Sequence, residues 1–179
     1  MIDTGVILID PKYLHNVGAA IRACSCFAVG SMVWTGDRVN PLEYERIPRE
    51  ERMKGYKSVQ FFNDDKPLGY FTHCTPVCVE VMEESEPLTT FVHPDRAVYV
   101  FGPEDGGVPQ VYRRLCHRFV HIPSHHCLNL SGAVNVILAH RMMQRQTSGL
   151  EALLPLGDML HEQRGLATPE MDRVGWNGK

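Results

Sequence analysis

The segment that most constrains the fold is the run Phe-Gly-Pro-Glu-Asp-Gly-Gly-Val-Pro at residues 101–109. It follows an apolar run at residues 97–100 that is typical of a buried strand, and it precedes residues 110–115, which are typical of a short helix. Glycine permits sharp turns and a close approach of the backbone to a ligand. Because open α/β sheets bind ligands at the carboxyl ends of their strands, this strand end predicts a site, with Glu104 as a candidate polar group.

Apolar runs that predict strands alternate along the chain with segments that predict helices. Strands are expected at residues 5–9, 31–34, 59–62, 76–81, 97–101 and 119–122, and helices at residues 16–27, 65–72, 110–115 and 128–144. Residues 37–56 are polar and contain two prolines, which predicts a loop with a short helix. The alternation is typical of an α/β domain with a mainly parallel sheet.

The first predicted helix lies in a segment that is almost without charge. Between residues 13 and 36 the only Asp, Glu, Lys or Arg is Arg22. A lone arginine there either extends its charged end to water or meets a carboxylate or phosphate through its planar donors. Asn16 either caps the helix or meets a ligand. Glu104 either caps or solvates its loop or holds the Arg22 guanidinium, and sequence spacing cannot decide between them.

A second segment, residues 119–140, contains no Asp, Glu, Lys or Arg. It nevertheless carries Asn129 and Ser131 at the start of the longest predicted helix. Taken alone, these two side chains are expected to cap that helix by satisfying its first N–H groups. The alternative is that they face a ligand, because polar groups in apolar surroundings need partners.

Overall charge gives no support for nucleic-acid binding, since the formal net charge is -3. Basic residues do cluster in the polar loop, where four glutamates dilute them. A solvated mixed-charge surface and a patch that contacts phosphates are equally compatible with this pattern. The basic residues of the loop are Arg38, Arg46, Arg49, Arg52, Lys54 and Lys57.

Other classes of site and location are disfavoured. No apolar run approaches the ~20 residues of a membrane span, and the N-terminus lacks the basic start of a signal peptide. The six cysteines are scattered, so we expect a cytoplasmic protein with reduced thiols. A histidine- and cysteine-rich stretch at residues 116–127 has zinc-binding residue types but no Cys-x-x-Cys pair, so we expect exposed loop histidines and no metal.

Three segments in order resemble the SpoU/TrmH-like branch of the SPOUT class of RNA methyltransferases. The first is Asn-Val-Gly-Ala-Ala-Ile-Arg-Ala at residues 16–23, and the second is Val-Phe-Gly-Pro-Glu at residues 100–104 followed by Gly-Val-Pro at 107–109. The third is Ile-Pro at residues 122–123 followed by Leu-Asn-Leu-Ser-Gly-Ala-Val at 128–134. Each segment is weak evidence alone, but the ordered set is specific.

The resemblance implies a Rossmann-like parallel sheet with a C-terminal trefoil knot, in a single methyltransferase domain at residues 1–148. Residues 149–179 would form a tail, partly disordered or docked on a partner. The family further implies a homodimer that binds S-adenosylmethionine in the knot and releases S-adenosylhomocysteine. The expected substrate is tRNA. The residues Phe-Gly-Pro-Glu and Leu-Asn-Leu-Ser in the motifs resemble most those of the enzymes that act at the wobble position.

Site residues carry over from the same motifs. By resemblance, Arg22 activates or orients the ribose 2′-hydroxyl. The polar residues expected to support it are Asn16, Glu104, Asn129 and Ser131. The cofactor is expected against Gly102, Pro103, Ile122, Pro123, Cys127 and Leu128, although the family usually has Ser where this chain has Cys127. RNA contacts are expected, from the charge pattern of the polar loop and not from the motifs, at Arg46, Arg49, Arg52 and Lys54.

The predicted function is therefore RNA 2′-O-ribose methylation with S-adenosylmethionine as methyl donor. An rRNA substrate is one alternative, and a non-catalytic RNA-binding module that kept the fold is another, favoured by the Cys127 departure. A generic nucleotide-binding domain is disfavoured because residues 101–109 lack the Gly-Lys-Ser/Thr ending of a phosphate-binding loop.

Overall fold

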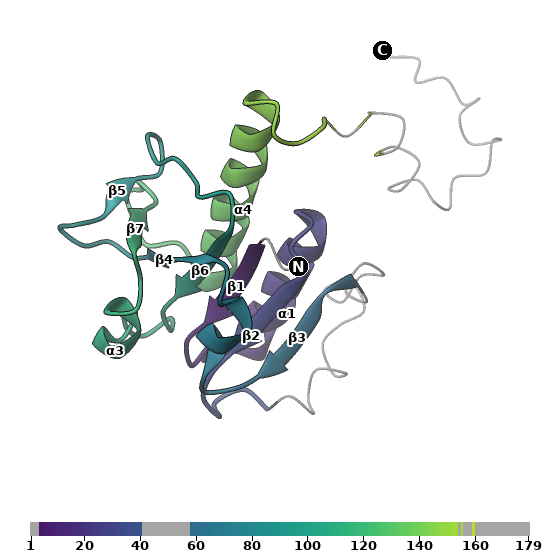
Figure 1. The fold of residues 1–179 in the computed structure, drawn as a ribbon. Coiled ribbons are helices and arrows are strands. Elements are labelled where there is room, and N and C mark those ends of the chain that lie inside the picture. The colour runs from purple at the N-terminus through teal and green to yellow at the C-terminus, as the bar shows by residue number, and fades with distance from the viewer. Residues whose placement is uncertain (1–3, 41–57, 154, 156–158, 160–179) are drawn as a thin grey trace, which may run out of the picture. The chain divides into compact units, whose positions relative to one another are not determined.

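A computed structural model describes residues 4–40, 58–153, 155 and 159 of the 179-residue chain (Figure 1). The strands are β1 (Thr4–Leu8), β2 (Ser31–Trp34), β3 (Gln60–Asn63), β4 (Thr75–Val79), β5 (Glu86–Pro87), β6 (Ala97–Phe101) and β7 (Arg118–His121). The helices are α1 (Leu14–Cys26), α3 (Gln110–Arg113) and α4 (Leu130–Thr147), with a 3-10 helix at Pro67–Phe71. Within these residues, no helix combines the length and the apolar character needed to cross a membrane.

The strands form one sheet in the order β3-β2-β1-β6-β4-β7-β5, and every neighbouring pair is parallel. This confirms the predicted α/β class with a Rossmann-like parallel sheet. Because β2 lies on one side of β1 and β4 lies on the far side of β6, the chain direction across the sheet reverses between β1 and β6. Parallel sheets bind ligands at such a switch point, outside the carboxyl ends of the strands. The trefoil knot stays a prediction from the resemblance.

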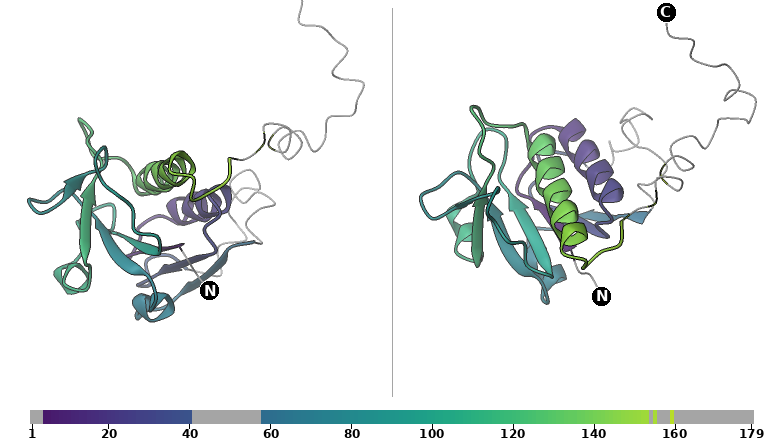
Figure 2. Two further views of the ribbon diagram at one scale, coloured as in Figure 1. Left: turned by 45° about the horizontal axis from the view of Figure 1, so that its top comes forward. Right: turned by 90° about the horizontal axis from the view of Figure 1, so that it is seen from above.

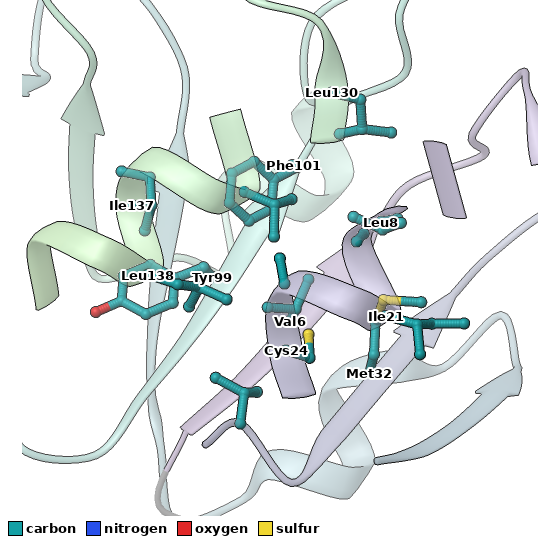
Figure 3. Close-up of a cluster of buried hydrophobic side chains, with 14 of the residues drawn as sticks. Val6, Leu8, Ile21, Cys24, Met32, Tyr99, Phe101, Leu130, Ile137 and Leu138 are labelled. Atoms are coloured by element: carbon teal, nitrogen blue, oxygen red, sulfur yellow. The ribbon is translucent and has the colours of Figure 1, made fainter. Parts of the chain in front are cut away.

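Alternating side chains of the strands pack on the two faces of the sheet. On one face, α1 and α4 lie side by side and cover a core of strand residues that includes Val6, Met32 and Tyr99 (Figures 2 and 3). On the other face, Ile7, Val33 and other strand residues pack with the 3-10 helix and the region of α3. Burial on both faces explains why the central strands appear in the sequence as uninterrupted apolar runs.

The predicted elements agree with the structure in kind, with small shifts at their ends. The bounds of β2 and β6 are as predicted, and α1 begins two residues earlier than expected. The short strand β5 was not predicted, because Glu86–Pro87 is exposed and lies at the edge of the sheet, where an apolar pattern is not required. The short helix expected within residues 37–56 falls largely outside the described residues.

The chain divides into two compact units, residues 1–144 and 145–179. In the described part of the second unit, the end of α4 is closed by Gly149, which has a φ of 73°. The Leu150 N–H donates to the Arg145 carbonyl at 2.9 Å, as in a helix end closed by a left-handed residue. An ion pair between Arg145 and Glu151 (3.4 Å) adds to this turn.

Candidate functional site

The three motif segments meet at the carboxyl edge of the sheet. The loop after β1 leads into α1, the glycine-rich loop follows β6, and the segment after β7 leads into α4. Because β1 and β6 are adjacent and β4 separates β6 from β7, these loops emerge close to one another. The site is therefore built from parts of the chain that are far apart in the sequence.

Asn16 is the centre of the polar contacts at this edge. Its amide nitrogen donates to Glu104 Oε1 at 2.6 Å, and its amide oxygen accepts from Ser131 Oγ at 3.3 Å. The side chain is only 2% exposed, so these bonds satisfy a polar group that water does not reach. Of the two roles that the sequence left open for Asn16, capping is excluded: α1 begins at Leu14 with Tyr13 as the N-cap, which leaves the Asn16 side chain free to point inward.

Glu104 links the glycine-rich loop, through its two oxygens, to the first motif and to the segment before it. Besides the bond from Asn16, its Oε2 accepts the Lys12 N–H at 2.7 Å. Partial burial would raise the pKa of Glu104, but the hydrogen bonds from Lys12 and Asn16 outweigh it and hold the pKa below its ordinary value. The carboxylate therefore stays ionised through the mildly acidic range and fixes the start of α1. Arg22 lies further along the same helix, and it is exposed rather than partly buried.

The glycine-rich loop folds back on itself. A Cβ at Gly102 would lie 2.6 Å from the Val108 nitrogen, so only glycine fits this close approach. Glu80, the residue after β4, holds the end of the loop because its Oε2 accepts the Val108 N–H at 2.8 Å. Its other oxygen accepts the Val81 N–H at 3.0 Å. Glu80 was not among the predicted site residues, because the sequence pattern places this carboxylate within the strand expected at residues 76–81, whereas β4 ends at Val79.

Arg38 fastens the same loop to the loop after β1. Its guanidinium forms two bonds with the Asp105 carboxylate, at 3.0 and 2.9 Å. It also pairs with the Asp10 carboxylate at 2.9 Å and bonds to the Asp10 carbonyl. The Arg38 guanidinium keeps the pKa of Asp105 below its usual range. Arg38 was counted in the sequence among possible phosphate contacts, but here it joins the loops after β1, β2 and β6.

The third motif contributes one cap and one contact to the site. Asn129 Oδ1 accepts the Gly132 N–H at 2.7 Å, so the expected capping role of Asn129 at α4 is confirmed. Ser131 instead donates to Asn16, so it joins the motifs rather than capping the helix. Before α4, Ile122 is half-buried, whereas Pro123, Cys127 and Leu128 are exposed. Pro103 is half-buried in the glycine-rich loop.

The remaining expectations concern RNA contacts and metals. Arg46, Arg49, Arg52 and Lys54 lie outside the described residues. In the part of the chain that the structure describes, no three His, Cys, Asp or Glu side chains are grouped as a metal site would require. One of the histidines considered for zinc, His121, hydrogen-bonds through Nδ1 to Ser85 Oγ at 2.9 Å.

Comparisons with solved structures agree with this architecture. The A. aeolicus TrmH/SpoU tRNA modifying enzyme matches with a TM-score of 0.71 at 21% identity, over 94% of this chain and 91% of that chain. The SpoU methyltransferase AviRb from Streptomyces viridochromogenes matches with a TM-score of 0.67 at 20% identity, over 81% of this chain but only 60% of its own. A third structure, which concerns the 2-OH methylation of C/U34 on tRNA, matches with a TM-score of 0.63 at 20% identity, over 82% of this chain and 97% of that chain.

Sequence comparison assigns the family. No curated protein sequence matches the chain. The family model of the SpoU rRNA methylase family, however, matches residues 3–139, which include all three motif segments and every strand of the sheet. The resemblance seen in the motifs is thereby confirmed, and the chain belongs to the SpoU rRNA methylase family.

Proposed function

We propose that this protein is an S-adenosylmethionine-dependent RNA methyltransferase that methylates a ribose 2′-hydroxyl of tRNA. The observation that carries the proposal is the buried Asn16 amide, which bonds to Glu104 and Ser131 and so joins the three motifs of the family in one site. Family membership supports RNA methylation, and the chain's resemblance to a structure concerned with C/U34 of tRNA supports the wobble position.

The cofactor fits the carboxyl edge of β6, β4 and β7. AviRb, at 19% identity, has been crystallised with S-adenosylmethionine bound. In this chain the backbone around Gly102 folds so closely that a Cβ would collide with it, and Gly102, Pro103, Ile122, Pro123, Cys127 and Leu128 would hold the cofactor mainly through main-chain groups. A cradle of main-chain groups does not require a hydroxyl at position 127. The cofactor supplies a methyl group that its sulfonium charge already activates.

Arg22 would act on the ribose oxygen. A guanidinium remains protonated in proteins and is therefore a poor base. It can instead stabilise the negative charge that develops on the 2′-oxygen as the hydroxyl proton leaves, with a phosphate of the RNA as the proton acceptor. Glu104, Asn16 and Ser131 would act as positioning residues, because they fix the first turn of the helix that carries Arg22.

RNA binding is proposed to involve residues beyond this site. Arg46, Arg49, Arg52 and Lys54 would contact phosphates. A homodimer would combine two such local basic surfaces, although each chain has a formal net charge of -3. We further propose a methyltransferase domain at residues 1–148 with a tail at 149–179, and a cytoplasmic location. The six cysteines are all free, as that location requires.

The test is transfer of a labelled methyl group from S-adenosylmethionine to total tRNA and, in parallel, to rRNA, followed by mass spectrometry of the nucleosides. We expect a 2′-O-methylated nucleoside from tRNA. Arg22→Ala should abolish it while cofactor binding is retained. Arg114→Ala, which removes an exposed arginine from the region of α3 on the other side of the sheet, is the matched control and should keep the activity.

The alternatives give different results in the same experiment. Methylation of rRNA alone would mean that the substrate is rRNA and not tRNA. The family to which the chain belongs is described as one of rRNA methylases, which supports this alternative. A methylated base would contradict the ribose assignment. Cofactor binding without transfer to either RNA would contradict both substrates. Loss of cofactor binding together with retained RNA binding would identify a non-catalytic module.

A further inference from the structure

We propose that the rings of Tyr13 and His15 form a stacking subsite for a nucleobase of the RNA substrate. The inference rests on the proposed function, since it names how the same site would hold the nucleotide. The two rings lie 5.4 Å apart between centroids, with an angle of 20° between their planes, so they already form a stack. Nucleobases in single-stranded RNA are commonly bound by stacking on such aromatic side chains.

Both rings are exposed to solvent at the start of α1. Tyr13 is 45% exposed, and His15 is exposed as well. Tyr13 occupies the N-cap position of α1 but makes no side-chain hydrogen bond to the helix. The exposed ring therefore has no capping role that would explain it. A large aromatic side chain left partly in water next to a candidate active site is available to bind a ligand.

The stack lies on the same side of α1 as Arg22. His15 and Arg22 are seven residues apart, which is about two helical turns, and both are exposed. At ~1.5 Å per residue the two positions are separated by about 10 Å along the helix axis. If Arg22 contacts the ribose oxygen, the stack lies within reach of the base of the target nucleotide or of its neighbour.

The charges around the stack favour a neutral ligand group over a phosphate. Lys12 lies 5.4 Å from the centre of the Tyr13 ring, but its ammonium group also pairs with Asp105 at 3.5 Å. Arg38 is engaged by Asp105 and Asp10. Because these cations are matched by carboxylates, they offer little attraction to the RNA backbone. Base stacking tolerates such a balanced surface, since it uses the π face of the base.

The test compares Tyr13→Leu with Tyr13→Phe. Leucine removes the aromatic face but keeps an apolar side chain, whereas phenylalanine keeps the aromatic face. With bulk tRNA as the probe, we expect Tyr13→Leu to weaken binding roughly 5-fold to 100-fold, the range for loss of one stacking contact. Tyr13→Phe should bind like the wild type. Affinity for S-adenosylmethionine, measured by calorimetry, should be the same in all three proteins.

The salt dependence of binding separates stacking from phosphate contact. The logarithm of the binding constant falls with the logarithm of salt concentration in proportion to the number of phosphates neutralised. Tyr13→Leu should leave that slope unchanged, whereas the double variant Arg49→Ala/Arg52→Ala should reduce it. A reduced slope in Tyr13→Leu would overturn stacking, because it would mean that the segment acts through Lys12.

The outcomes also separate this inference from the proposed function. If the wild type methylates tRNA and Tyr13→Leu binds tRNA equally well, the stacking subsite is wrong and the methyltransferase assignment stands. If the wild type neither binds nor methylates tRNA, both are wrong. A loss of affinity in Tyr13→Phe equal to that in Tyr13→Leu would likewise overturn stacking, because the aromatic face would then be irrelevant.

Discussion

A buried cluster of hydrogen bonds behind β6 makes the stability of this protein depend on pH. His93 is 7% exposed, and its ring nitrogens contact the Tyr99 hydroxyl at 2.6 Å and His140 Nδ1 at 2.9 Å. Burial, reinforced by His140 and by the positive charges of Arg141 and Arg118, lowers the pKa of His93 from 6.5 to about 3. The folded protein therefore keeps His93 neutral at pH values where an unfolded chain would protonate it.

The direction and size of the effect follow from that difference. Between pH 6.5 and about 3 the unfolded state binds more protons at residue 93, so the free energy of unfolding falls as the pH falls. Each pH unit in this window corresponds to about 1.4 kcal/mol. Acidification from pH 6.5 to about pH 5 should thus remove about 2 kcal/mol of stability through His93 alone. Above pH 6.5 the side chain is neutral in both states and contributes no pH dependence.

The measurement is urea unfolding of the wild type and of His93→Gln at about pH 7 and about pH 5. Glutamine can hydrogen-bond but does not titrate, so His93→Gln should lose about 2 kcal/mol less than the wild type on acidification. Its lower stability at neutral pH does not affect this comparison, which concerns the difference between the two pH values. His73→Gln, at an exposed position, is the control and should behave like the wild type. Equal losses in the wild type and His93→Gln would refute the reasoning.

Three further predictions concern the site and the core. Glu80→Ala removes the acceptor of the Val108 N–H and should raise the Kd for S-adenosylmethionine in calorimetry with a small change in Tm; an unchanged Kd would contradict its positioning role. Gly102→Ala forces a Cβ to within 2.6 Å of the Val108 nitrogen and should abolish cofactor binding, whereas Gly106→Ala, with its nearest neighbour atom at 3.7 Å, should retain it. Leu138→Ala, at a position 1% exposed between α4 and the sheet, should lower the free energy of unfolding by about 2 to 5 kcal/mol. A loss well below that range in urea unfolding would mean that the core collapses around the cavity.

Much of the fold could be predicted because burial leaves a plain pattern in the sequence. β2 and β6 are buried along their whole length, and their apolar residues define their ends. Strand order could not be predicted, because nothing local in the sequence states that β6 lies between β1 and β4. The edge strand β5 was not predicted because its two residues are exposed and pair with β7 alone, so they carry no apolar pattern.

The sequence could name polar residues that the fold brings together, but it could not give their contacts. The motif resemblance selected Asn16, Glu104 and Ser131, yet reasoning from local patterns favoured a helix cap for Ser131 and left a cap open for Asn16. Their actual partners lie 88 and 115 residues away in the sequence, which no local pattern encodes. Glu80 was not named, because the sequence pattern placed it inside the strand expected at residues 76–81. Its importance depends on Val108, which comes beside it only in the folded chain.

The Asn16 amide ties the glycine-rich loop and the start of α4 to the helix that carries Arg22. A buried amide has N–H donors and an acceptor oxygen to satisfy. Here the Glu104 carboxylate accepts from the amide nitrogen, and the Ser131 hydroxyl donates to the amide oxygen. Aspartate at this position would lose the donor and place a second negative charge beside Glu104, whereas alanine would leave Glu104 and Ser131 without this partner. Because α1 is continuous from Leu14 to Cys26, a displacement of the loop that carries Glu104 moves the start of the helix, and with it Arg22. In the proposed reaction, the alignment of the methyl donor and the ribose oxygen therefore depends on one amide group that touches neither of them.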